Sequence, residues 1–203
     1  MPFLERVLTP KRLEHSLGVM QVMRELAEVY ALDLEASLAA GLLHDAAKDL
    51  TPSHQLELIA EGNIEIHDAS EWDYVLYLHG PVGAYFVYRE LGVTDPLILD
   101  AIKMHTYYGH GANLNAPIVW CLRFSDLLEP NRDWQNVSWL SKGIGRLREA
   151  VYAGRMQEAA FLQTGWLIQW FEADGKPVHP NMRRVYQELS TRLGLDSSFL
   201  EQA

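Results

Sequence analysis

Six side chains in this sequence could together bind metal ions, because each lies where an isolated polar group would be costly. Four histidines and two aspartates occur within or beside apolar helical patterns, namely His15, His44, Asp45, His79, His105 and Asp126. Burying an imidazole or a carboxylate without a partner costs free energy. One such histidine alone is usually a structural core residue that hydrogen-bonds a backbone carbonyl. Six such groups favour a shared charged centre over six unrelated partners.

The ligand types indicate which metals this centre would hold. Imidazole and carboxylate groups without a thiolate suit iron, manganese, nickel or zinc better than calcium or magnesium alone. His44 and Asp45 are adjacent on one expected helix, so the carboxylate can bridge a pair of ions while the neighbouring imidazole binds one of them. We therefore expect two transition-metal ions, held by side chains from facing helices of a bundle.

The elements that must position these side chains are all expected to be helices. Thr9, Thr51 and Asp95 each precede a proline, a common start of a helix. Apolar residues at three- and four-residue steps indicate helices that begin near residues 10, 34, 52, 79, 96 and 117. Similar patterns cover about 139–173, with a break near Gly154, and a last helix is expected from 180. No alternating run is long enough to indicate a strand.

We predict an all-α fold, a helical bundle with the dinuclear metal site in its core. The sequence contains no internal repeat and no Pro/Gly/Ser-rich linker, so residues 1–203 are expected to form one domain. Helices within about 10–133 would carry the metal site, and helices within about 139–203 would pack on them.

The composition excludes several classes of protein. The 203 residues include 17 Lys and Arg against 27 Asp and Glu, a net charge of −10, so we expect no nucleic acid polymer as a partner. No apolar run is long enough for a membrane span, and the single cysteine, Cys121, excludes a disulfide framework. We expect a cytoplasmic protein with a small-molecule partner. Tryptophans such as Trp134 and Trp139 could form the face of a homodimer.

The candidate ligands and the segments around them resemble a known family. A histidine, a His-Asp pair and a distant aspartate are the signature of the HD-domain metal-dependent phosphohydrolases, and the chain has His15, His44-Asp45 and Asp126. It is most similar to the YqeK family of bacterial HD proteins, which are symmetrical diadenosine tetraphosphate hydrolases. The matching segments are Gly-Leu-Leu-His-Asp-Ala-Ala-Lys-Asp at 41–49, Leu-His-Gly-Pro-Val-Gly-Ala at 78–84 and Asp-Leu-Leu-Glu-Pro-Asn-Arg-Asp at 126–133.

This resemblance implies a single HD domain with a defined ligand set. One metal ion would be held by His15, His44, Asp45 and Asp126, and Asp45 would bridge to a second ion bound by His79 and His105. The resemblance also implies that the ions are iron. The chain departs from the family near the expected substrate pocket, where it has His-Thr-Tyr-Tyr-Gly at 105–109 and the family commonly has His-Thr-Thr-Gly. That departure removes no ligand but leaves the choice of nucleotide open.

The expected reaction is the cleavage of diadenosine tetraphosphate to two ADP. A metal-bound hydroxide would attack an inner phosphorus, with Asp45, Lys48 and Arg132 as the catalytic residues. Lys48, Arg132 and His179 are predicted to bind substrate. Lys48 could equally be a solvated helix lysine, and Arg132 a partner of Glu129, which itself reads as a turn residue before a proline.

Two other functions stay open at this level. One is an HD phosphohydrolase that acts on another nucleotide, such as a dNTP or a mononucleotide. The other is a nucleotide-binding regulator without catalysis, whose metal site only shapes a pocket. Substitution of Asp45 separates the enzymes from the regulator, because only an enzyme has turnover to lose.

Overall fold

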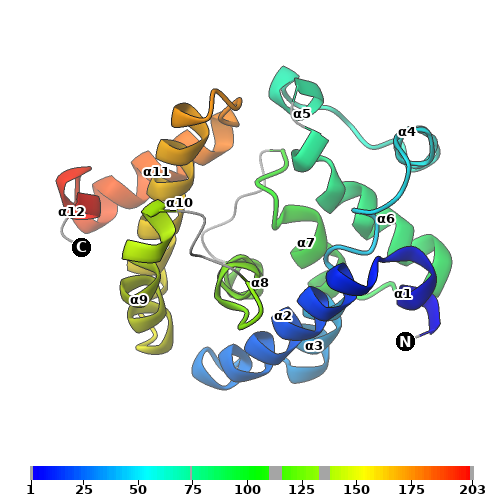
Figure 1. The fold of residues 1–203 in the computed structure, drawn as a ribbon, viewed down its shortest axis with the longest axis horizontal. Helices are drawn as coiled ribbons and strands as arrows, with labels where there is room; N and C mark the ends of the chain where they lie inside the picture. Colours follow the sequence, from blue (N-terminus) through cyan, green and yellow to red (C-terminus); the bar gives the residue numbers. More distant parts are fainter. Residues whose placement is uncertain (1, 74, 110–115, 133–137, 202–203) are drawn as a thin grey trace.

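The computed structural model describes residues 2–73, 75–109, 116–132 and 138–201, and these contain helices but no strand (Figure 1). In chain order the elements are α1 (Pro2–Val7), α2 (Pro10–Val29), α3 (Leu34–Leu43), α4 (Pro52–Glu61), α5 (Ala69–Asp73), the 3-10 turn η1 (Val75–Tyr77), α6 (His79–Leu91), α7 (Pro96–Met104), α8 (Pro117–Leu128), α9 (Ser138–Tyr152), α10 (Met156–Ala173), α11 (Pro180–Leu193) and α12 (Ser198–Glu201). The all-α prediction is confirmed, and each predicted helix start is observed.

Local hydrogen bonds explain several of these starts. The side chains of Thr9, Thr51 and Asp95 accept hydrogen bonds from backbone N–H groups in the first turns of α2, α4 and α7. Each of these helices also has a proline at its beginning, where the missing N–H costs nothing. Gly154, with φ of 73°, lies between α9 and α10. Glycine adopts this left-handed backbone conformation without a Cβ clash, which ends α9.

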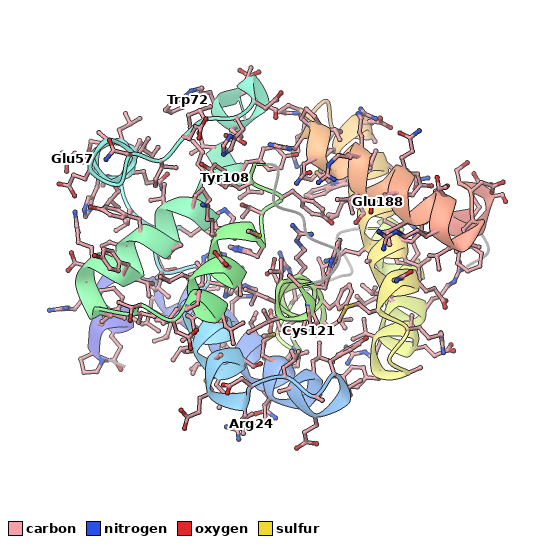
Figure 2. All side chains as sticks on the ribbon, turned by 180° about the vertical axis from the view of Figure 1, so that it is seen from behind. Arg24, Glu57, Trp72, Tyr108, Cys121 and Glu188 are labelled. Carbon is pink, nitrogen blue, oxygen red and sulfur yellow. The ribbon has the colours of Figure 1, made fainter. Side chains whose placement is uncertain are left out.

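Helix α8 lies in the middle of the molecule, between α9 and α10 on one side and α2, α3 and α7 on the other (Figure 1). Its Trp120, Cys121 and Phe124 are buried. Figure 2 shows Cys121 among side chains near the centre, whereas Glu57 lies at the outside. Because neighbours cover α8 on both sides, polar side chains on this helix are held in fixed positions.

Two sequence predictions concern the surface. None of the described helices combines the length and the apolar character that crossing a bilayer requires. The suggested homodimer face used Trp134, which lies outside the described residues, and Trp139, of which only the helical backbone in α9 is described. The homodimer therefore stays a prediction.

The close crossing of α2 and α3 gives a first testable prediction, at Gly41. A Cβ added there would lie 2.9 Å from Met20 Cα and 3.0 Å from Met23 Cγ. Alanine favours a helix over glycine by about 1 kcal/mol, but overpacking against backbone costs about 1–3 kcal/mol. We expect Gly41→Ala to lower the free energy of unfolding, measured by urea denaturation.

Gly145 on α9 supplies the matched control. No described atom lies within 4 Å of a Cβ added at that position. Gly145→Ala should therefore stabilise the protein by up to about 1 kcal/mol through helix propensity alone. If both substitutions stabilised the protein equally, the close contact of α3 with Met20 would not limit the packing of these helices.

Candidate metal centre

The six predicted side chains converge from separate helices. His15 lies on α2, His44 caps the end of α3, Asp45 lies in the turn that follows, His79 is the first residue of α6, His105 caps the end of α7, and Asp126 lies on α8. The expectation that His44 and Asp45 share a helix is wrong in detail, because α3 ends at Leu43. Tight turns after α3, in place of another helical turn, carry Asp45 and Lys48.

Asp45 lies at the centre of the cluster. Its Oδ1 is 3.2 Å from Nε2 of His79, 3.5 Å from Nε2 of His44 and 3.9 Å from Nε2 of His105. Its Oδ2 is 3.7 Å from Nε2 of His15. The side chain is completely buried. The two carboxylate oxygens therefore face different imidazoles, which suits a bridging ligand.

Asp126 faces the cluster from α8. Its Oδ1 lies 3.1 Å from Nε2 of His15 and 4.0 Å from Nε2 of His44. One ligand atom from each of His15, His44 and Asp126 lies within 4.8 Å of the others, and the same holds for His44, Asp45 and His105. The cluster thus contains two overlapping groups of candidate ligands.

All four imidazoles are oriented in the same way, through Nδ1. This atom lies 2.9 Å from the Gly41 carbonyl in His44 and 2.6 Å from the Ile102 carbonyl in His105. In His79 it contacts the carbonyl of Leu76, and in His15 it lies 3.2 Å from a carboxylate oxygen of Glu129. Since these oxygens only accept, Nδ1 carries a hydrogen in all four rings, and in each neutral ring Nε2 presents a lone pair to the cluster.

These lone pairs need a cation. Nε2 of His79 and Nε2 of His105 lie 2.9 Å apart, yet in these tautomers neither atom has a hydrogen to donate. Nε2 of His15 and Nε2 of His44 are buried and have no hydrogen-bond partner among the described residues. Buried lone pairs that face one another are unfavourable unless a positive ion lies between them. The residues present therefore fit a metal centre.

The protonation states also suit metal binding. Burial lowers the pKa of His44, His79 and His105, so these imidazoles are neutral at neutral pH. Burial opposes ionisation of Asp45, but the charge of Lys48 holds the pKa of its carboxyl well below the usual value. Three neutral imidazoles and an ionised carboxylate are the forms that coordinate metals.

His15 differs, and its protonation gives a second prediction. Burial would lower its pKa, but hydrogen bonds to Asp126 and Glu129 and the charge of Asp45 raise it to about 9. A metal that binds His15 must displace this proton at neutral pH. We expect the affinity for Mn²⁺ to fall about tenfold for each pH unit below about 9. Calorimetry at pH 7 in two buffers should show release of about one proton, and an affinity independent of pH would contradict this.

Three cations surround the two carboxylates. Lys48 Nζ donates to both oxygens of Asp45, at 3.1 and 3.0 Å, and Arg12 Nη1 donates to Oδ2 at 3.2 Å. Arg132 Nη1 donates to Oδ1 of Asp126 at 2.6 Å. Lys48 and Arg132 were predicted at the site from the sequence, but Arg12 was missed. Its position one helical turn before His15 was the available signal.

Glu129 was also missed, because the sequence suggested only a turn residue. It is buried, its Oε1 contacts His15 Nδ1, and its Oε2 accepts from the backbone N–H of Asn131 at 2.8 Å. The contact with His15 joins residues 114 positions apart. A carboxylate behind an imidazole fixes its tautomer and strengthens it as a ligand.

Glu129→Gln is therefore expected to weaken metal binding by about 10–100-fold while the protein stays folded. The amide keeps the shape of the side chain but loses the charge that holds Nδ1–H of His15. Mn²⁺ titration followed by calorimetry measures the change. Glu14→Gln is the control, since Glu14 lines the cavity beside His15 but is exposed. Equal affinities in the two variants would contradict the supporting role of Glu129.

The cluster opens into a cavity of about 380 Å³, which we call the main cavity because three of the six candidate ligands line it. These are His79, His105 and Asp126, and Lys48 and Arg132 line it as well. A second, more polar cavity of about 700 Å³ lies beside His15 and Glu129, and Arg12 and Arg132 line both cavities. The metal candidates and two arginines thus lie where two cavities adjoin.

His179, predicted to bind substrate, is placed differently. It caps the start of α11, where its Nδ1 accepts from the backbone N–H of Asn181 at 3.0 Å. Its Nε2 lies 2.9 Å from Oε1 of the buried Glu71. Both ring nitrogens are therefore engaged, and His179 is absent from the described lining of either cavity. The structure does not bring this residue to the site.

A family model decides the relationship of this chain to known proteins. The model of the HD domain matches residues 12–148, which include all six clustered side chains. The chain belongs to the HD-domain family. The cluster of histidine and aspartate side chains fits the divalent metal sites of HD domains.

Three known proteins are similar over most of this chain. A symmetrical bis(5'-nucleosyl)-tetraphosphatase of Halalkalibacterium halodurans is 28% identical over 187 residues, 90% of each chain. The protein of the same name from Bacillus subtilis is 34% identical over 143 residues, 68% of this chain and 72% of its own. The crystal structure of a predicted HD superfamily hydrolase from Clostridium acetobutylicum has a TM-score of 0.82 at 28% identity and covers 94% of this chain and 95% of its own.

Proposed function

We propose that this HD protein hydrolyses diadenosine tetraphosphate symmetrically to two ADP, with two divalent metal ions as cofactors. The observation that carries the proposal is the convergence of four imidazole Nε2 atoms and two carboxylates beside a cavity that His79, His105 and Asp126 line. The relatives named symmetrical tetraphosphatases support the substrate class.

The clustered side chains would hold the metals. One ion would be bound by His15, His44, Asp45 and Asp126, and the second by Asp45, His79 and His105. Iron is the proposed metal, although manganese, nickel and zinc accept the same ligand types. When bound, such a pair of ions supplies Lewis-acid chemistry, because it lowers the pKa of a water molecule to about 7 and offsets charge on phosphoryl oxygens.

The cations of the chain bind and orient the polyphosphate in this proposal. Arg12 and Lys48 donate to Asp45, and Arg132 donates to Asp126. Once metals neutralise these carboxylates, the three cations can donate to phosphate oxygens as well. The planar guanidinium of Arg132 suits a phosphate, and Lys48 would stabilise the charge of the oxygen that leaves.

The two cavities support a substrate with two similar halves. Arg12 and Arg132 line both cavities, so a polyphosphate bound near these arginines could place one nucleoside in each. Cleavage near the middle of that chain yields two nucleoside diphosphates. A mononucleotide would use only one cavity, which makes this alternative less suitable.

Three further features of the protein belong to the same proposal. We propose that residues 1–203 act as one domain, because one apolar cluster extends from α2 through α8 to α11 and α12. A homodimer and a cytoplasmic location rest on the sequence alone.

Product analysis tests the function. The purified protein with Mn²⁺ or Fe²⁺ should convert diadenosine tetraphosphate to ADP as the only product, separated by ion-exchange chromatography. Formation of ATP and AMP would contradict symmetrical cleavage. Phosphate or pyrophosphate released from dNTPs, with the dinucleotide untouched, would favour the other HD phosphohydrolase reading. Binding without turnover under any metal would favour the regulator.

A further inference from the structure

The main cavity beside the metal centre also has apolar walls. They include Leu76, Leu167, Trp170 and Phe171, contributed by η1 and α10. Apolar and aromatic walls of this kind suit a planar nucleobase better than a phosphate. Two polar side chains, Arg123 of α8 and Gln163 of α10, also line this cavity.

Arg123 is a buried cation held on three sides. Its guanidinium lies 3.8 Å from the ring centroid of Tyr107 and 4.5 Å from that of Trp120. Its Nε and Nη2 donate to the carbonyls of His105 and Met104, at 3.3 and 2.6 Å. Burial lowers its pKa to about 10, so it stays charged at neutral pH. The two aromatic rings fix the plane of the guanidinium, and the two carbonyls fix the direction of Nε and Nη2.

The remaining nitrogen of Arg123 is a donor without an acceptor. Its Nη1 is buried and has no hydrogen-bond partner in the part of the chain that the structure describes. No carboxylate of the described residues forms an ion pair with it. The side chain as a whole is only 3% exposed. An unmatched buried donor of this kind costs free energy unless a ligand completes it.

Gln163 has an unmatched acceptor, which complements the unmatched donor of Arg123. Its Nε2 donates to the backbone carbonyl of Arg123 at 2.9 Å. A carbonyl only accepts, so this bond fixes which end of the amide faces away from α8. Its Oε1 is also buried and lacks a partner among the described residues. Two residues that line the cavity therefore offer one unmatched donor and one unmatched acceptor, and the Gln163 side chain is bound to the backbone of Arg123.

We propose that Arg123 and Gln163 recognise the nucleobase of one half of the substrate, by donating to a ring nitrogen and accepting from the adjacent amino group of adenine. This inference rests on the proposed function and adds the residues that bind the base. The phosphates inside a dinucleoside polyphosphate are fully ionised at neutral pH and have no hydrogen for Gln163 Oε1, so the acceptor excludes them as the partner of this pair. A ribose hydroxyl could donate and accept, but it does not suit the flat apolar walls.

The test compares substrates that differ in one group. The first analogue replaces both adenines by unsubstituted purine, which keeps the ring nitrogens and loses the amino group. The second carries 2'-deoxyribose. We expect the protein to hydrolyse the purine analogue with a kcat/KM at least about tenfold below that of diadenosine tetraphosphate, because Gln163 Oε1 is left unpaired. Gln163→Met should reduce this preference to within about twofold.

Gln169→Met, on the exposed face of the same helix, is the matched control and should keep the full preference. Thermal denaturation checks that each variant is folded. The inference is overturned if the unmodified protein shows no preference for diadenosine tetraphosphate over the purine analogue. It is also overturned if folded Gln163→Met keeps that preference. If Gln163→Met lost only a discrimination against the 2'-deoxy analogue, Arg123 and Gln163 would be assigned to the ribose. That result would also overturn the inference.

Failure of the proposed function gives a different result. In that case no dinucleotide is hydrolysed, and calorimetry with ADP and with purine riboside diphosphate replaces the kinetic comparison. Tighter binding of ADP by at least about tenfold, lost in Gln163→Met, would support base recognition even in a protein with another reaction. Equal binding of the two diphosphates would overturn it.

Discussion

Replacing Asp45 by asparagine is expected to lower kcat/KM for diadenosine tetraphosphate by at least about 10³-fold. The carboxylate faces all four imidazoles, with its oxygens 3.2 Å from His79 Nε2 and 3.7 Å from His15 Nε2. The amide of Asn keeps the volume but has one oxygen and no charge, so it cannot serve as an anionic bridge. Elemental analysis should show that the variant retains fewer metal ions per chain than the unmodified protein.

Asp49→Asn is the matched control for this experiment. Asp49 lies in the same turns, accepts from the backbone N–H of Thr9 at 2.9 Å and lies 3.6 Å from Arg12 Nε, but it is outside the cluster. We expect it to retain most of the activity and all of the metal. Full turnover in Asp45→Asn would contradict the dinuclear mechanism, whereas absence of turnover in both the unmodified and variant proteins would favour the regulator.

Replacing Lys48 by methionine is expected to lower kcat by about 10²–10³-fold, the cost of removing one charge-stabilising donor from an active site. Lys48 Nζ donates to both oxygens of Asp45 and lines the main cavity. If its role is to stabilise the leaving oxygen, kcat falls and the metal content is unchanged. Steady-state kinetics with elemental analysis of the same samples gives both readouts.

The alternative role of Lys48 is to hold Asp45 in place. In that case Lys48→Met would lose metal and activity together, and added metal would restore part of the rate. Lys103→Met is the control, because Lys103 lies exposed on the last turn of α7 and outside the main cavity. A variant of Lys48 with unchanged kcat would leave it as a structural partner of the carboxylate only.

The helices could be predicted from the sequence because their signals are local. Thr9, Thr51 and Asp95 cap helices through hydrogen bonds that span two or three residues, and a neighbouring proline reinforces each start. The end of α3 was less predictable. The sequence pattern continues past His44, but α3 stops at Leu43 and turns carry Asp45 into the cluster. Tertiary contacts of Asp45 with His79 and His15 outweigh the local preference for another helical turn.

The candidate ligands could be selected from the sequence because polar groups in apolar patterns need a common partner. The residues that contact and orient these ligands could not be predicted from the sequence. Glu129 meets His15 across 114 residues, and Arg12 meets Asp45 across 33. His179 was predicted near the substrate, but the structure places it elsewhere. Both of its ring nitrogens are used in contacts with Asn181 and Glu71.

By itself the sequence determined an all-helical chain of the HD family and the six side chains that could bind metal. Only the tertiary structure decided which nitrogen of each imidazole faces the cluster, and which polar atoms lack a partner in the cavity. The physical reason is that helix formation depends on residues a few positions apart. The orientation of His15 by Glu129, and the unmatched groups of Arg123 and Gln163, depend on side chains that meet only when the helices pack.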